Sequence, residues 1–160
     1  MIPMANTEAV RLRLMLQGFA CDTDPRVAES ARWLRFTPAL CTLCIIAGTA
    51  LRSPTVLWSF AILAAIGAAG WSVFDELFNA LVRHWVRAER LLPSPAPRRF
   101  AMAVAAVWSA GAGWLMTIGL GWAGVAAGSA LAVAGATVAT THFCLGSWLY
   151  HLLRRFEPAA

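Results

Sequence analysis

The sequence predicts an all-α, polytopic membrane protein with four transmembrane helices arranged as two hairpins, plus amphipathic interfacial helices at the N-terminus and in mid-chain. Three observations lead to this fold class. Of the 160 residues, 59% are hydrophobic and 13% are charged, whereas about a quarter of an ordinary soluble domain is charged. The 54 residues between Arg99 and Arg154 contain no Asp, Glu, Lys or Arg, and one membrane crossing needs only about 20 residues. The arginines also gather on one side of the predicted spans.

The chain divides into an N-terminal arm (1–22), one transmembrane domain (23–155) and a short tail (156–160). We expect that the arm is not a cleaved signal peptide, because the apolar run before Cys21 is only about seven residues, at the lower limit for such a segment. Asp24 followed by Pro25 is typical of a helix N-cap and first helical position. A short interfacial helix is therefore predicted ahead of the first span.

The first hairpin is expected to consist of spans at 33–51 and 54–76. Residues 36–51 carry no charge but cover only about 24 Å as a helix, so Arg35 should extend its side chain toward the headgroups. Pro54 suits the first position of the second span. The second hairpin should cross at 99–119 and 122–153, with a turn in the glycine-containing stretch at 119–124.

Residues 73–87 repeat apolar pairs at helical spacing, opposite a polar face that includes Asp75 and Arg83. This pattern is typical of an amphipathic helix. It should either continue the second span out of the bilayer or lie along the interface. The prolines in "PSPAP", 93–97, then end it.

Charge distribution predicts the orientation. All thirteen basic residues are arginine, and only Arg52 falls on the side opposite the termini. The other twelve are residues 11, 13, 26, 32, 35, 83, 87, 90, 98, 99, 154 and 155. The positive-inside rule therefore places both termini in the cytoplasm. Because the arginines flank apolar spans, the lipid bilayer is the expected partner, and nucleic acid is not.

The last span, taken as one helix, has two distinct faces. Small residues and one histidine share the first: Gly124, Gly128, Gly135, His142 and Gly146. The spacing Gly124-x-x-x-Gly128 lets another helix approach closely, so this face is predicted to pack against a helix of this chain or of another subunit.

The second face places Cys144, Ser147 and His151 in one stripe, and the first span repeats the spacing with Cys41 and Cys44. Cys44 and Cys144 should lie at the same depth, since each is nine or ten residues from the inner arginines. Three interpretations stay open. We favour ordinary packing of small side chains; the others are sulfur or electron handling by Cys44 and Cys144 and a soft metal site on the three cysteines and His151.

His142 is a histidine within a predicted span, which makes it a candidate ligand for a haem or another pigment. A packed, hydrogen-bonded ring is the favoured interpretation. The sequence contains no glycine-rich phosphate loop, no G-x-S-x-G and no H-E-x-x-H, motifs that would indicate a catalytic site. It therefore names no catalytic residue, no metal site and no cofactor.

Three short motifs resemble a bacterial membrane family described as domain of unknown function 4395: "DPR" at 24–26, "PRRFA" at 97–101 and "FCLGSWLY" at 143–150. The resemblance covers about 22–155 and implies a small multi-span protein of the bacterial inner membrane. It also implies a Cys-x-Gly-Cys motif before a tyrosine. Cys144, Gly146 and Tyr150 match this motif, whereas Ser147 replaces its second cysteine. Some similar proteins occur near sulfur-transfer proteins.

These features together favour a non-catalytic accessory or scaffolding subunit that packs against a larger, possibly redox-active, membrane complex. The glycine face and the basic amphipathic connection are the reasons for this expectation. The alternative functions are a membrane thiol protein acting through Cys44 and Cys144, and a pigment- or haem-binding protein acting through His142.

Overall fold

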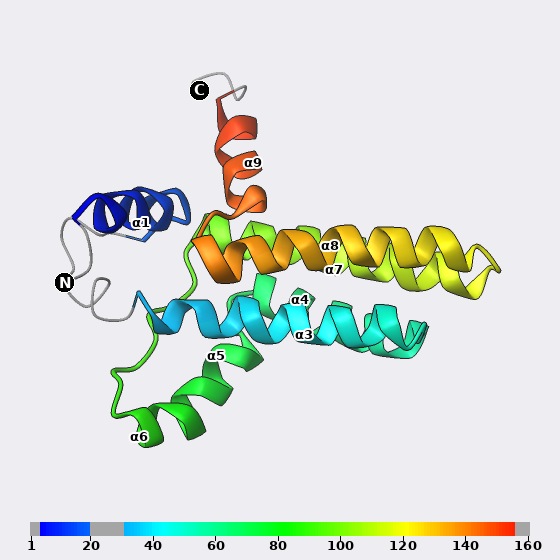
Figure 1. The fold of residues 1–160 in the computed structure, drawn as a ribbon, viewed down its shortest axis with the longest axis horizontal. Coiled ribbons are helices and arrows are strands. Elements are labelled where there is room, and N and C mark those ends of the chain that lie inside the picture. The colour runs from blue at the N-terminus through cyan, green and yellow to red at the C-terminus, as the bar shows by residue number, and fades with distance from the viewer. Residues whose placement is uncertain (1–3, 20–30, 156–160) are drawn as a thin grey trace.

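The computed structural model describes residues 4–19 and 31–155, and every regular element within these ranges is a helix. Four helices lie side by side in an elongated bundle: α3 (Phe36–Ala50), α4 (Pro54–Ala68), α7 (Ala96–Thr117) and α8 (Gly121–Thr141) (Figure 1). Helix α3 packs against α4 and α8, and α7 packs against α4 and α8. The predicted helical class and the two hairpins are thus present.

Three helical stretches are long and apolar enough to cross a membrane: Trp33–Ala50, Ala96–Thr117 and Gly121–Thr141. The first joins the short 3₁₀ turn η1 (Trp33–Arg35) to α3. A fourth crossing exists only if Pro54–Ala68 and Val73–Val86, which meet at a bend of 87°, are counted as one span. The three to four candidate spans are consistent with a helical membrane protein.

The predicted second span, 54–76, is not one straight helix. Helix α4 ends at Ala68, and Gly70 adopts a φ of 110°, a conformation that glycine adopts without steric cost. Ser72 then caps the next helix, because its Oγ accepts a hydrogen bond from the Asp75 amide at 3.2 Å. The sequence left two arrangements open for residues 73–87: a straight continuation of the second span, or a helix along the membrane interface. The bend excludes the straight continuation, and an interfacial helix would need such a bend.

Three consecutive helices follow the bend: α5 (Val73–Leu77), the π-helical turn η2 (Phe78–Val82) and α6 (Arg83–Val86). We call Val73–Val86 the bent segment. Phe78 is fully buried and belongs to a second apolar cluster, with Leu14, Leu34 and Leu91. This cluster joins α1 (Met4–Leu16) and the bent segment to the end of the bundle.

The predicted fourth span, 122–153, is also interrupted. Helix α8 ends at Thr141, His142 adopts a φ of 60°, and the separate helix α9 (Leu145–Arg154) begins after Cys144. Figure 1 shows α9 leaving the bundle across its long axis. The Thr141 hydroxyl accepts a hydrogen bond from the Phe143 amide at 3.1 Å, which helps to stabilise the turn. The face that was predicted to run from Gly124 to Gly146 is therefore divided between two helices.

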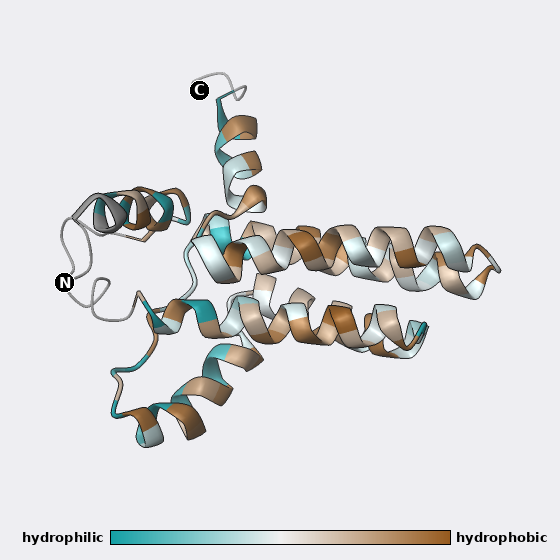
Figure 2. Cartoon of the chain, viewed as in Figure 1, coloured by the Kyte–Doolittle hydropathy of each residue, from teal (hydrophilic) through white to brown (hydrophobic). Residues whose placement is uncertain are grey.

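Helices α1, α9 and the bent segment all lie at one end of the bundle (Figure 1), and Figure 2 shows much of the hydrophilic sequence gathered there. The predicted interfacial helix that begins at Asp24–Pro25 falls mostly outside the described residues. The arm itself is helical from Met4 to Leu16. Within the described part of the chain, the arginines predicted to be cytoplasmic belong to the elements at this end.

The glycines of α8 pack against helices of this chain. A Cβ atom added at Gly128 would collide with the Thr49 side chain, and one at Gly135 with Thr42, so both glycines admit α3. Gly124 faces α7 at Met116. Gly146, now in α9, lies against Ala101 of α7. The helices that approach these glycines closely are α3 and α7 of the same chain.

Candidate functional site: an apolar pocket with a charged end

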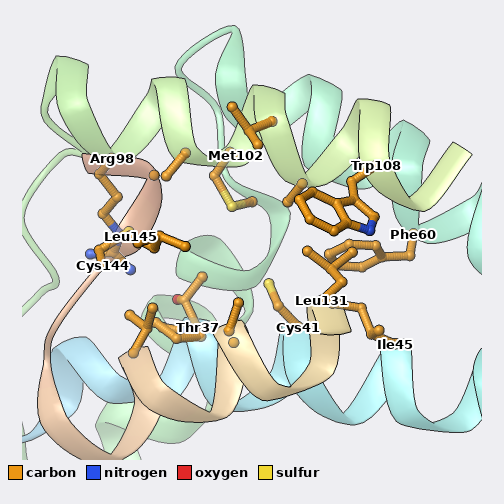
Figure 3. A pocket seen from close by; sticks show the side chains of 18 of the residues that line it. Thr37, Cys41, Ile45, Phe60, Arg98, Met102, Trp108, Leu131, Cys144 and Leu145 are labelled. Atoms are coloured by element: carbon orange, nitrogen blue, oxygen red, sulfur yellow. The ribbon is translucent and has the colours of Figure 1, made fainter. Parts of the chain in front are cut away.

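A cavity of about 360 Å³ lies between α3, α7 and α8, within the usual range for small-molecule sites. Its wall is predominantly apolar. The larger apolar side chains are Ile45, Phe60, Met102, Trp108, Leu131 and Val138. In Figure 3, Trp108 and Phe60 lie at one end of this pocket, whereas Arg98 and Cys144 lie at the other. The pocket is thus amphipathic along its length.

Arg98, in the first turns of α7, is the charged group of the pocket wall. It is 6% exposed, and its Nη2 lies 3.6 Å from Asp75 Oδ1. That separation is an ion pair but exceeds hydrogen-bond length. Among the described residues, no group accepts a hydrogen bond from this Nη2. The Phe19 ring lies 5.7 Å from the guanidinium carbon. A buried donor at the end of an apolar pocket is therefore left without an acceptor.

Asp75 is already engaged by other donors. Its Oδ1 accepts a hydrogen bond from the Thr37 hydroxyl, and its Oδ2 accepts one from Ser94 Oγ at 3.1 Å. These contacts join α3, the bent segment and the loop before α7 at one buried carboxylate. Asp75 balances the charge of Arg98 without satisfying the hydrogen-bonding capacity of its Nη2.

His142 lies beside this region, one residue beyond the α8 span. Its Nε2 accepts a hydrogen bond from Arg35 Nε at 2.7 Å, and its carbonyl accepts one from Gln17 Nε2 at 2.6 Å. Burial, and then the positive charges of Arg35, Arg13 and Arg98, lower the pKa of His142 from 6.5 to about 4. The ring is therefore neutral at pH 7. The nitrogen that could hold a haem iron already accepts the hydrogen bond from Arg35.

Helix α1 covers this end of the pocket. Besides the Gln17 bond, Arg13 Nη1 donates to the Thr141 carbonyl at 2.8 Å, and a His151 ring nitrogen lies 3.0 Å from the Leu16 carbonyl. Gln17 also lines the pocket. The arm, for which the sequence predicted no role, thus shields the charged end.

The predicted thiol stripe does not form as expected, because Cys144 precedes α9 while Ser147 and His151 lie within it. Cys41 and Cys144 both line the pocket, whereas Cys44 is absent from its wall and packs against the core of the bundle. Ser147 is fully buried, and its Oγ has no hydrogen-bond partner among the described residues. The predicted pairing of Cys44 with Cys144 is thus replaced by a shared pocket for Cys41 and Cys144.

The cysteines Cys41, Cys44 and Cys144 are not disulfide-bonded, and Cys21 lies outside the described residues. Within 4–19 and 31–155, no three His, Cys, Asp or Glu side chains are grouped so that they could hold a metal ion. The hydroxyls of Thr137 and Thr140 bond to carbonyls of their own helix. Threonine hydroxyls often bond in this way to carbonyls of their own helix, so these two side chains do not indicate a site.

Sequence reasoning missed Asp75 and Arg98 as a buried pair. Arg98 was interpreted only as one of the cytoplasmic arginines, and Asp75 as part of a solvated face. The spacing Ser72-x-x-Asp75 does carry a helix-start signal, which could have revealed the bend. The partnership with Arg98 depends on a contact across the fold, which no local pattern encodes.

The fold and the site are those of a small all-helical chain with three to four candidate membrane spans and an interior amphipathic pocket. The chain belongs to the family described as domain of unknown function (DUF4395), whose model matches residues 30–155. The match begins slightly later than the resemblance over 22–155 suggested. No curated protein and no solved structure matches the chain.

Proposed function

We propose that this chain is a multi-pass protein of the bacterial inner membrane, with both termini in the cytoplasm, that binds an apolar-tailed amphiphile in its interior pocket. The observation that carries this proposal is the asymmetry of the pocket wall: apolar side chains along most of its length and Arg98, Thr37 and Gln17 at one end. An apolar cavity of this kind excludes water and accepts hydrocarbon. A polar end fixes the orientation of a bound molecule.

The bilayer also supplies hydrocarbon surroundings, so a lipid tail gains little from burial alone. Selective binding must therefore come from the fit of the chain and from contacts at the polar end. Such contacts favour a protein that binds one kind of amphiphile over a nonspecific apolar surface.

Photolabelling tests the proposal. A long-chain alcohol with a diazirine on its chain is added to membranes that contain the protein, and labelled residues are mapped by mass spectrometry. Saturable labelling of α3, α7 and α8 at Cys41, Met102 and Leu131 is expected. Ala134→Phe, which fills the pocket, should lower this labelling by at least about tenfold, equivalent to 1.4 kcal/mol of binding free energy.

The matched control is Val133→Phe, since Val133 is adjacent in α8, is 67% exposed and is absent from the pocket wall. It should retain the wild-type labelling. Unsaturable labelling that is equal in the two variants would contradict the proposal, because it would mean that the probe only samples the lipid-facing surface.

An accessory or scaffolding role in a larger membrane complex is a second candidate. The observation in its favour is α9, which leaves the bundle and exposes Leu145, Trp148 and Leu153 by 45–56%. The α8 glycines no longer support this role, since they pack internally. Gentle extraction followed by a native gel should yield stoichiometric partners that Trp148→Ser weakens; a lone, monodisperse protein would argue against the role.

A thiol function is also supported in an altered form, with Cys41 and Cys144 as the pair that shares the pocket. It predicts that Cys144→Ala abolishes function at normal protein levels, whereas Cys44→Ala does not. Equal loss of protein in the two variants would indicate packing alone.

A further inference from the structure

We infer that the bound molecule is a single-chain amphiphile with a carboxylate headgroup, and that Arg98 is the residue that takes this headgroup. The inference rests on the proposed function, because it names the class of ligand for the same pocket. Its basis is the geometry at the charged end. Arg98 is only 6% exposed there, and its Nη2 donor has no hydrogen-bond acceptor among the described residues.

The local charge favours an anion. Three arginines, Arg13, Arg35 and Arg98, act electrostatically on the same buried His142, whereas Asp75 is the carboxylate paired with Arg98. His142 accepts its hydrogen bond from Arg35 as a neutral ring. A monoanionic headgroup would compensate part of this excess of positive charge in a region shielded from water, where charge interactions are strong.

The available donors favour Arg98 as the headgroup ligand. Thr37 donates to Asp75, and Gln17 donates to the His142 carbonyl. Arg98 Nη2 alone among these three has no acceptor within the described part of the chain. A carboxylate oxygen can accept a charge-assisted hydrogen bond from this donor. Because neighbouring atoms cover Nη2, the guanidinium must turn toward the pocket to make this bond, while the Thr37 and Gln17 bonds can stay in place.

The size of the pocket favours one chain. The cavity of about 360 Å³ lies near the lower end of the range for small-molecule sites, which is about 300–1,000 Å³. A cavity near the lower end of this range suits one hydrocarbon chain better than the paired chains of a phospholipid. A fatty carboxylate therefore matches both the length of apolar wall and the single unfilled donor.

The test compares two photoreactive probes of equal chain length, a fatty acid and the corresponding alcohol, in membranes that contain the full chain. In the wild-type protein the acid should label the pocket at least about tenfold more efficiently than the alcohol, a preference typical of a charge-assisted hydrogen bond. Arg98→Gln should abolish the preference. Arg99→Gln is the matched control, because exposed Arg99 binds the Ala68 and Ala69 carbonyls and does not line the pocket.

A second variant guards against misfolding. If Arg98→Gln leaves Asp75 unpaired and unfolds the protein, the double variant Arg98→Gln with Asp75→Asn removes both charges and should fold, bind the alcohol and show no acid preference. Equal labelling by acid and alcohol in the wild type would overturn the inference while leaving the proposed function intact. Absence of saturable pocket labelling by either probe would overturn the proposed function itself. Competition by a two-chain phosphatidic acid as strong as that by the fatty acid would overturn both the single chain and the carboxylate headgroup.

Discussion

At the scale of single residues, the buried carboxylate of Asp75 organises one end of the molecule. It accepts hydrogen bonds from Thr37 and Ser94 and pairs with Arg98. The side chains of Asp75 and Arg98 are only 12% and 7% exposed. Because an isolated charge is costly in such surroundings, each member of the pair depends on the other.

Asp75→Asn is therefore expected to destabilise the fold by about 3–5 kcal/mol, the usual effect of breaking a buried ion pair from one side. The control is Glu76→Gln at the adjacent position, which removes only an exposed ion pair with Arg90. The side chains of Glu76 and Arg90 are 44% and 66% exposed, so the loss of stability should be about 0–1 kcal/mol. Thermal unfolding in mild detergent measures both. Equal stability of the two variants would contradict the assigned role of Asp75.

His142 gives the fold a predicted dependence on pH. Its pKa is lowered from 6.5 to about 4, mainly by burial, so the unfolded chain binds more protons than the folded chain between these values. Stability should fall as the pH drops from 6.5 to about 4, by on the order of 2 kcal/mol from this residue. His142→Asn, which tolerates the left-handed backbone, should reduce this loss.

The measurement is the difference between wild-type and His142→Asn unfolding midpoints at several pH values, since other carboxyl groups titrate in both proteins. The difference should be constant above about pH 6.5, where the ring is neutral in both states, and should shrink as the pH falls toward 4. A difference that is constant with pH would mean that His142 has the same pKa in the folded and unfolded chains, and it would contradict the lowered value.

At the scale of elements, the two breaks in the predicted spans determine where the site forms. The bend after Gly70 brings Asp75 to α3, and the turn at His142 places Cys144 at the pocket and Gly146 against α7. Composition and hydropathy predicted the helices, because their apolar character is local. The breaks depend on contacts such as Arg35 with His142, which join distant segments and leave no local periodicity.

Close packing of α3 on α8 leads to a prediction at this scale. Gly128→Ala should destabilise the bundle by about 1–3 kcal/mol, because the added Cβ collides with the Thr49 side chain. Gly111→Ala, in the interior of α7, meets nothing within 4 Å and should be neutral or stabilising, since alanine favours a helix over glycine. Resistance to unfolding in a denaturing detergent distinguishes them, and equal loss in both would contradict the packing described.

At the scale of the whole molecule, the bundle has a polar end, with α1, α9 and the bent segment, and an opposite end with the α3–α4 and α7–α8 turns (Figure 1, Figure 2). The sequence predicted this polarity because the arginine distribution is a global property of the chain. It did not predict the pocket, because a cavity depends on how four surfaces meet. Cys41 and Cys144 were identified as candidates, and the pocket wall brings Cys144 together with Cys41 rather than with Cys44.

The orientation gives a topology prediction. A reporter fused after Ala160 should register as cytoplasmic, and a cysteine introduced by Arg52→Cys at the exposed α3–α4 turn should react with an impermeant maleimide added outside the cell membrane. The same reagent should not reach Arg155→Cys. The tests use a background that lacks the four native cysteines; the reverse labelling pattern would invert the orientation derived from the arginines.

Native mass spectrometry of the protein, purified with its own membrane lipids, tests the central claim most directly. The account predicts one bound single-chain amphiphile per chain in the wild type and in Val133→Phe, and its loss in Ala134→Phe. A bare wild-type mass, or the same lipid mixture on all three proteins, would contradict the claim that this bundle holds a selective pocket.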